Sequence, residues 1–170
     1  RDSTNSSLYD LLKTAAMLKG RTVAPSVSMS VSPGSRQVLT MLANCGALSD
    51  ILVSGARLLE CACGPCIGMG FSPNSGGVSL RTFNRNFEGR ISPDVSQNYL
   101  MQPANVIAYA IAGTMDIDLE KDPLGTDAEG NPVFYADIVP AADEVAALVD
   151  EFVTADLYEQ GAANMFEGDA

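Results

Sequence analysis

The chain contains no histidine and no tryptophan, and only 18% of its 170 residues are charged. The missing histidine excludes a Ser-His-Asp or Cys-His catalytic group and any His-containing zinc site within these residues. No run approaches the roughly 20 consecutive apolar residues that span a bilayer. No basic, apolar leader opens the chain, so we expect a cytoplasmic protein without a membrane segment. Acid–base chemistry must therefore use other groups, or residues supplied by another polypeptide.

The length and a hydrophobic content of 46% predict one globular domain over residues 1–170 with a sizeable core. Short strands alternate with helices along the chain. This alternation predicts an α/β fold, a three-layer α/β/α sandwich with a mainly parallel sheet. The acidic, turn-rich stretch 116–132 is expected to be a loop. Helices are expected over 8–18, 36–44, 48–53, 105–111, 140–153 and 155–165, and strands over 27–31, 58–59, 78–82 and 133–138.

Charge is distributed unevenly. The net charge is −11, which argues against nonspecific nucleic-acid binding. Residues 1–90 nevertheless carry nine Lys or Arg against five Asp or Glu, whereas residues 91–170 carry one Lys against sixteen acids. All seven arginines and all four cysteines lie in the first part. Surplus guanidinium groups there suit an anionic ligand, because each can grip a carboxylate or phosphate with two hydrogen bonds.

A Cys-x-x-Cys pair is formed by Cys63 and Cys66 in the run Cys-Gly-Pro-Cys. Two thiolates at this spacing can ligate one metal centre, and the intervening Gly and Pro permit the tight turn that brings them together. A redox dithiol and a buried, functionless pair are the alternatives. Cys45 and Cys61 are the remaining cysteines; a place in the core is expected for Cys45 and a different orientation for Cys61.

The second group is the segment Arg81–Arg90, with three arginines and two asparagines in ten residues. These side chains form a dense set of anion-binding donors. An exposed loop paired with the acidic part of the chain is the alternative. If both motifs serve one ligand, Cys63 and Cys66 lie at a strand end facing this segment.

Taken together, the motifs resemble the aconitase family. The similar segments occur in order along the whole chain. They are Thr-Asn-Ser at 4–6, Pro-Gly-Ser at 33–35, Cys-Gly-Pro-Cys-Ile-Gly at 63–68, Asn-Arg-Asn-Phe-x-Gly-Arg at 84–90, Asp-Pro-Leu-Gly-Thr-Asp at 122–127, Gly-Asn-Pro-Val at 130–133 and Phe-Glu-Gly-Asp at 166–169.

The resemblance implies a fragment of a multi-domain hydro-lyase of the tricarboxylic acid cycle. Such an enzyme interconverts citrate and isocitrate through cis-aconitate with a four-iron four-sulfur cluster. This chain resembles the third α/β/α domain, the iron–sulfur domain, with the remaining aconitase domains as partners. The catalytic base and the His-Asp acid group belong to those domains, so the isolated chain is expected to be inactive.

The resemblance also assigns roles to residues. Cys63 and Cys66 match two cluster ligands, and Ser3 stands at the position of the third family cysteine. Arg85 and Arg90 match binders of substrate carboxylates, and Asn84 matches an asparagine near the cluster. Because serine is a harder and rarely deprotonated ligand, the cluster is expected to be absent or incomplete in this chain.

Other functions stay open at this point. Isopropylmalate, homoaconitate and 2-methylcitrate dehydratases share the architecture. A metal-binding or redox-sensing module using Cys63 and Cys66 is an alternative of a different class. RNA binding, as in aconitases that have lost their cluster, is a further one, which the net charge makes minor.

Overall fold

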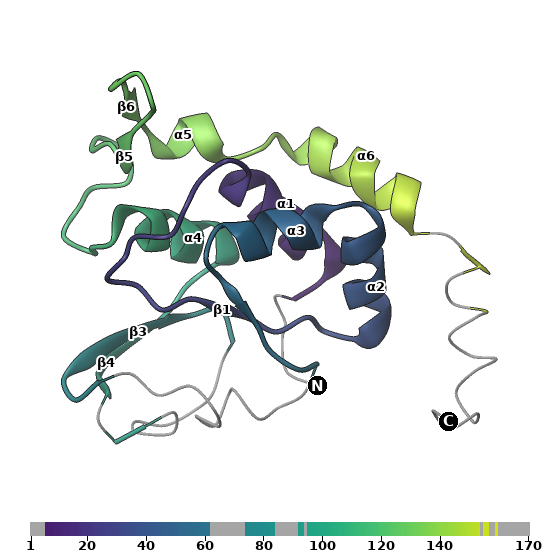
Figure 1. The fold of residues 1–170 in the computed structure, drawn as a ribbon, viewed down its shortest axis with the longest axis horizontal. Coiled ribbons are helices and arrows are strands. Elements are labelled where there is room, and N and C mark those ends of the chain that lie inside the picture. Colours follow the sequence, from purple (N-terminus) through teal and green to yellow (C-terminus); the bar gives the residue numbers. More distant parts are fainter. Residues whose placement is uncertain are drawn as a thin grey trace.

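The computed structural model describes residues 6–61, 74–83, 92–93, 95–153, 155–156 and 159. Within these ranges helices and short strands alternate (Figure 1). The helices are α1 Leu8–Leu18, α2 Arg36–Asn44, α3 Ala47–Val53, α4 Pro103–Ala112, α5 Tyr135–Ile138 and α6 Ala142–Phe152. The strands are β1 Ser30–Val31, β2 Arg57–Leu58, β3 Gly77–Arg81, β4 Val95–Leu100, β5 Gly125–Thr126 and β6 Pro132–Val133.

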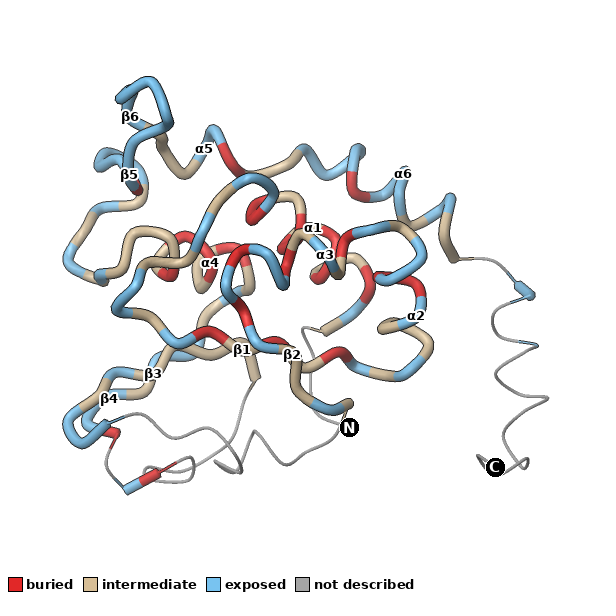
Figure 2. Tube along the Cα trace, viewed as in Figure 1, coloured by how far each residue is buried: buried red, intermediate tan, exposed pale blue. Residues whose placement is uncertain are grey.

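Helix α1 is the central element of the core. The Ser7 side chain caps its first turn by accepting a hydrogen bond from the Asp10 amide at 3.2 Å. Apolar residues at helical spacing then bury one side of the helix, and Met17 and Leu18 are fully buried. Helices α2, α3, α4 and α6 all pack against α1. Buried positions consequently cluster around α1, α3 and α4 (Figure 2).

The described strands form three separate pairs. β1 pairs with β2 and β3 pairs with β4, both in parallel, while β5 and β6 form an antiparallel hairpin. Each parallel pair is joined by a connection long enough to cross over, as parallel pairing requires. The predicted α/β fold class with mainly parallel pairing is therefore confirmed.

The helix predictions hold better than the strand predictions. α1, α2, α3, α4 and α6 each form close to the expected bounds. Three expected strands are found but are short or shifted, and the expected helix over 155–165 lies mostly outside the described residues. β4 was not predicted from the sequence, because its interior residues Ser96, Gln97 and Asn98 are polar and break the apolar alternation of a strand.

The expected strand over 133–138 is wrong for its second part, and the expected loop over 116–132 contains β5 and the start of β6. Residues Tyr135–Ile138 form the short helix α5 instead of a strand. The Asp137 carboxylate accepts a hydrogen bond from the Phe134 amide at 2.8 Å and so satisfies the backbone before this helix. Local side chain–backbone bonding thus overrides the strand propensity of Val, Phe and Tyr.

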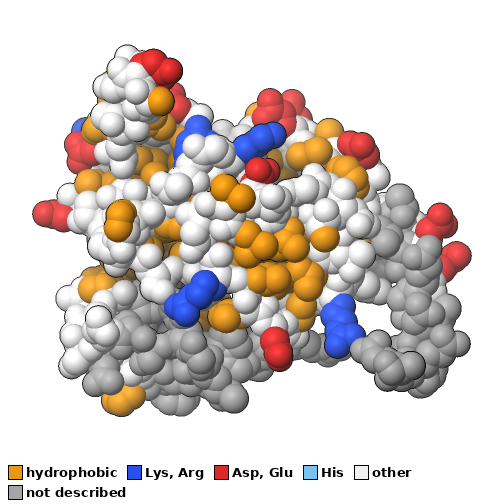
Figure 3. Space-filling view, viewed as in Figure 1, with side chains coloured by type: hydrophobic (Ala, Val, Ile, Leu, Met, Phe, Trp, Pro, Cys, Tyr) orange, Lys and Arg blue, Asp and Glu red, His pale blue; other side chains and the backbone are white. Residues whose placement is uncertain are grey.

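The acidic C-terminal region covers one side of the core. α5 and α6 run along the upper edge of the molecule, and the β5–β6 hairpin projects beside them (Figure 1). Acidic side chains lie along this edge, while apolar side chains gather over α3 (Figure 3), where Leu52 and Val53 are exposed. None of the helices in the described ranges has the length and apolar character to cross a bilayer.

Candidate functional site

The candidate site residues Ser3, Cys63, Cys66, Asn84, Arg85 and Arg90 all lie outside the described residues. The expectation that Cys63 and Cys66 face the Arg81–Arg90 segment therefore stays a prediction. What the structure does describe are the chain segments that lead into these residues, and their geometry is informative.

The segment leading to Cys63 leaves the sheet at β2. β2 pairs in parallel with β1, with Ser30 opposite Arg57 and Val31 opposite Leu58. The pairing continues past the strands, because the Leu59 amide donates to the Val31 carbonyl at 2.9 Å. The Ser32 hydroxyl then donates to the Glu60 carbonyl at 2.5 Å. Residues 57–60 are thus held by β1 and the turn after it.

The segment preceding α1 reaches the same turn. Gly34 lies against Ser6, and a Cβ atom placed on Gly34 would be only 2.9 Å from the Ser6 carbonyl oxygen. Ser35 closes the turn and caps α2, accepting a hydrogen bond from the Val38 amide at 3.2 Å. One turn, residues 32–35, therefore contacts both the start of α1 and the end of the β2 segment.

The arginine-rich segment begins at the end of β3. Leu80 pairs with Tyr99 and Arg81 pairs with Leu100, and the Met101 amide donates to the Arg81 carbonyl at 3.0 Å. The Arg81 guanidinium carbon lies 5.6 Å from the centroid of the Phe83 ring, which favours a cation–π contact. The backbone is therefore held by a paired strand up to Arg81, three residues before Asn84 in the sequence.

Two cysteines lie within the described part of the chain, and neither has a clustered partner there. Cys45 caps the C-terminus of α2, and its thiol donates to the Leu42 carbonyl at 3.5 Å. It is half-buried and packs against the core, where it was expected to lie. Cys61 is half-buried at the end of the β2 segment. Among the described residues no group of three or more His, Cys, Asp or Glu side chains is placed to hold a metal ion.

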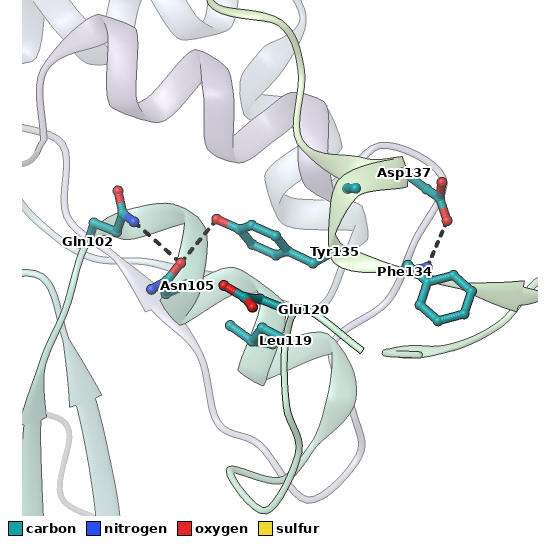
Figure 4. A pocket seen from close by; sticks show the side chains of 8 residues that line it. Gln102, Asn105, Leu119, Glu120, Phe134, Tyr135 and Asp137 are labelled. Atoms are coloured by element: carbon teal, nitrogen blue, oxygen red, sulfur yellow. Dashed lines mark hydrogen bonds between the residues drawn. The ribbon is translucent and has the colours of Figure 1, made fainter. Parts of the chain in front are cut away.

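A pocket of about 680 Å³ lies at the N-terminus of α4 (Figure 4). Its lining comes from α4, from the acidic loop and from α5, namely Gln102, Asn105, Leu119, Glu120, Phe134, Tyr135, Ala136 and Asp137. The Tyr135 hydroxyl donates to Asn105 Oδ1 at 3.0 Å, and Gln102 Nε2 approaches the same oxygen at 3.5 Å. Partial burial raises the pKa of Tyr135 above its ordinary value of 10.0.

The pocket was not predicted from the sequence. Its residues come from three segments separated by up to 35 positions, and only their packing brings them together. The wrong strand prediction over 133–138 also placed Tyr135 incorrectly, because a side chain at the start of a helix points in a different direction from one in a strand. The lining offers amide, phenol and carboxylate groups, which suit hydrogen bonding to a small polar molecule.

Two features define the class of this chain: an α/β domain with parallel strand pairs, and a Cys-x-x-Cys motif followed by an Asn-Arg-rich segment. A sequence model of the aconitase family (aconitate hydratase) matches residues 3–113. The chain belongs to the aconitase family.

Individual relatives carry the similarity through the acidic region as well. Aconitate hydratase A of Corynebacterium jeikeium is 42% identical over 94% of this chain. The enzymes of that name from Francisella tularensis subsp. holarctica and Bradyrhizobium diazoefficiens are 37% and 38% identical over 97% and 94% of it. The chain spans about a fifth of the length of the curated relatives it matches, 18% to 19% in these three.

Proposed function

We propose that this chain is the iron–sulfur domain of an aconitase-type hydro-lyase that isomerises citrate and isocitrate through cis-aconitate in the cytoplasm. The observation that carries the proposal is the span of the family match. Residues 3–113 include Ser3, the Cys63–Cys66 motif and the Asn84–Arg90 segment in family order. The relatives are named aconitate hydratase, which favours this reaction over those of the related dehydratases.

The chemistry of the donor set limits what this chain binds by itself. Thiolates such as those of Cys63 and Cys66 are the ligands that iron–sulfur clusters take. The hydroxyl of Ser3 is a poor substitute for the third thiolate. Two of the three positions therefore fit a four-iron four-sulfur cluster and one does not. When bound, the cluster supplies a Lewis-acid iron for the hydroxyl and carboxylate of the substrate.

The arginines bind and orient the substrate in this proposal. A tricarboxylate carries three anionic groups, and Arg85 and Arg90 can each donate two parallel hydrogen bonds to one of them. Asn84 adds an amide donor beside them. Since the chain has no histidine and spans a fifth of its relatives, the acid and base come from the remaining aconitase domains, and the isolated chain is inactive.

Iron binding tests the cluster proposal. In the full-length protein, Ser3→Cys should raise the iron and sulfide bound per chain after anaerobic reconstitution. Adding Cys63→Ser or Cys66→Ser should remove that gain, because only two of the three thiolates then remain to hold the cluster. Cys45→Ser is the matched control, since this thiol already bonds a helix carbonyl, and it should leave bound iron unchanged. Full iron binding in the Cys63→Ser variant would refute the assignment.

Kinetics test the arginines. Arg85→Lys or Arg90→Lys keeps the charge but loses the planar fork, so one of two carboxylate hydrogen bonds disappears. We expect kcat/KM in the Ser3→Cys protein to fall about ten- to hundred-fold while the melting temperature stays unchanged. Arg21→Lys is the control, because within the described part of the chain Arg21 Nη1 donates to the local carbonyls of Met17 and Lys19. An unchanged kcat/KM with a lowered melting temperature would assign these arginines to surface ion pairs.

A further inference from the structure

The turn formed by residues Ser32–Ser35 contacts two segments that are 54 positions apart in the sequence, at Ser6 and Glu60. Sequence reasoning alone explains the Pro-Gly-Ser run as a turn that starts a helix, and Ser35 does cap α2. That role does not account for Ser32 or Gly34. Both of these residues make their close contacts outside α2.

Gly34 packs closely against the first segment, at Ser6. Its φ lies outside the left-handed region, so glycine is not required here for backbone conformation. The requirement is space, because an added Cβ would lie 2.9 Å from the Ser6 carbonyl oxygen and 3.7 Å from the carbonyl carbon. The neighbouring atoms belong to the backbone, so relief of this contact must move the chain at Ser6.

Ser32 is a polar contact to the second segment. Its hydroxyl donates to the Glu60 carbonyl, beyond the last strand bond of the β1–β2 pair. Pro33, next to it, is buried and has a fixed φ, so the turn itself has little freedom. The carbonyl of Glu60 is therefore held by a rigid neighbour rather than by its own strand.

We propose that the turn Ser32–Ser35 is a positioning element that sets the spacing between the segment before α1 and the segment after β2. Ser3 lies three residues before Ser6, and Cys63 lies three residues after Glu60. Three residues of extended chain span at most about 11 Å, so in this proposal the turn anchors the chain within that reach of each ligand position. The functional meaning of the spacing rests on the proposed function, in which both positions belong to the cluster site.

Hydrogen–deuterium exchange on the full-length protein tests the positioning without reference to iron. Gly34→Ala should accelerate exchange about tenfold in peptides covering residues 3–10 and leave residues 57–66 nearly unchanged. Ser32→Ala should accelerate exchange in residues 57–66 and leave residues 3–10 nearly unchanged. Ser32→Thr keeps a hydroxyl and should retain the slow exchange of residues 57–66. Ser35→Ala should lower the melting temperature and affect only the start of α2.

Gly125→Ala is the matched control for Gly34→Ala. Gly125 also lies outside the left-handed region, and no atom of the described residues lies within 4 Å of a Cβ placed on it. Gly125→Ala should leave hydrogen–deuterium exchange unchanged in residues 3–10 and in residues 57–66. If Gly34→Ala leaves residues 3–10 unchanged, or if every variant accelerates exchange throughout the chain, the positioning role is wrong.

A thiol readout links the turn to the candidate ligands. In a Ser3→Cys background, a short bifunctional thiol reagent should join the introduced thiol to Cys63 or Cys66, as identified by mass spectrometry. Adding Gly34→Ala should lower that yield several-fold relative to Gly125→Ala. An equal yield in both variants would overturn the proposal. Failure of iron to bind while the exchange pattern holds would reject the cluster assignment and leave the positioning role standing.

Discussion

Residues 6–61 and residues 114–153 are stabilised in different ways. Among the described residues, five of the six largest fully buried side chains belong to the first region, Met17, Leu18, Leu42, Ile51 and Ser54, and Val145 belongs to the second. The second region is instead held by local hydrogen bonds that backbone amides donate to nearby carboxylates, and it contacts the core through Leu124, Ile138 and Val145. Residues 6–61 thus carry most of the described core, and residues 114–153 cover one side of it.

This difference predicts which mutations destabilise the whole fold and which have only a local effect. Apolar burial stabilises in proportion to the area removed from water, so truncation in the first region affects the whole fold. Carboxylates on exposed turns organise a few residues and contribute little to the global free energy of unfolding.

Leu18→Ala should have the largest effect. Leu18 has no exposed area at the end of α1, so its truncation leaves a cavity at the centre of the core. We expect a loss of about 3–5 kcal/mol in the free energy of unfolding. Chemical denaturation measures it, with Leu52→Ala as the control, because Leu52 is 42% exposed and its truncation should cost below about 0.5 kcal/mol. Equal losses would contradict the location of the core.

Gly113→Ala tests the junction between the two regions. Gly113 ends α4 with a φ of +76°, and an added Cβ would lie 2.6 Å from the Ala24 Cβ. We expect a loss of about 2–3 kcal/mol from backbone strain and this close contact. Gly130 has a φ of +87°, and no described atom lies within 4 Å of a Cβ placed on it. Gly130→Ala therefore measures the backbone strain without the close contact. If Gly113→Ala lowers the free energy of unfolding no more than Gly130→Ala does, Ala24 has shifted to make room for the added Cβ.

Val145→Ala weakens the attachment of the acidic region. Val145 is 1% exposed on α6, which packs on α1. Loss of two methyl groups should cost about 1–2 kcal/mol and should accelerate hydrogen exchange in α6 more than in α2. Leu148→Ala on the same helix is the control, because Leu148 is 39% exposed. Uniform acceleration across both helices would mean that the two regions unfold as one unit.

The pH response of the hairpin is the smallest expected effect. The side chain of Asn131 first, and backbone amides with it, hold the pKa of Asp127 below its ordinary value of 3.8. Because the folded pKa is lowered, the stabilisation is present above pH 3.8 and is lost as the pH falls through the folded value. The amide shift of Asn131, followed by NMR, should titrate with a midpoint below 3.8, and a midpoint at or above this value would contradict the hydrogen bonds.

The sequence allowed the helices to be predicted more accurately than the strands. Leu8–Leu18 repeats apolar residues at helical spacing behind a serine cap, and both are local properties of the chain. β4 escaped prediction because a strand with polar residues gains its stability from its neighbour β3, and local propensity does not record that partner. Residues 135–138 were misassigned because one carboxylate, that of Asp137, changes the backbone preference.

The candidate site divides in the same way. The order of residue types around Cys63, Cys66 and Arg85 follows from the sequence, and it determined the family and the chemistry proposed. Only the tertiary structure decided that Ser6 and Glu60 meet at one turn, and that the Tyr135 hydroxyl donates to Asn105 in the wall of a pocket. The physical reason is that motifs record which atoms are available. Steric contacts and hydrogen bonds between distant segments exist only after the core around α1 has formed.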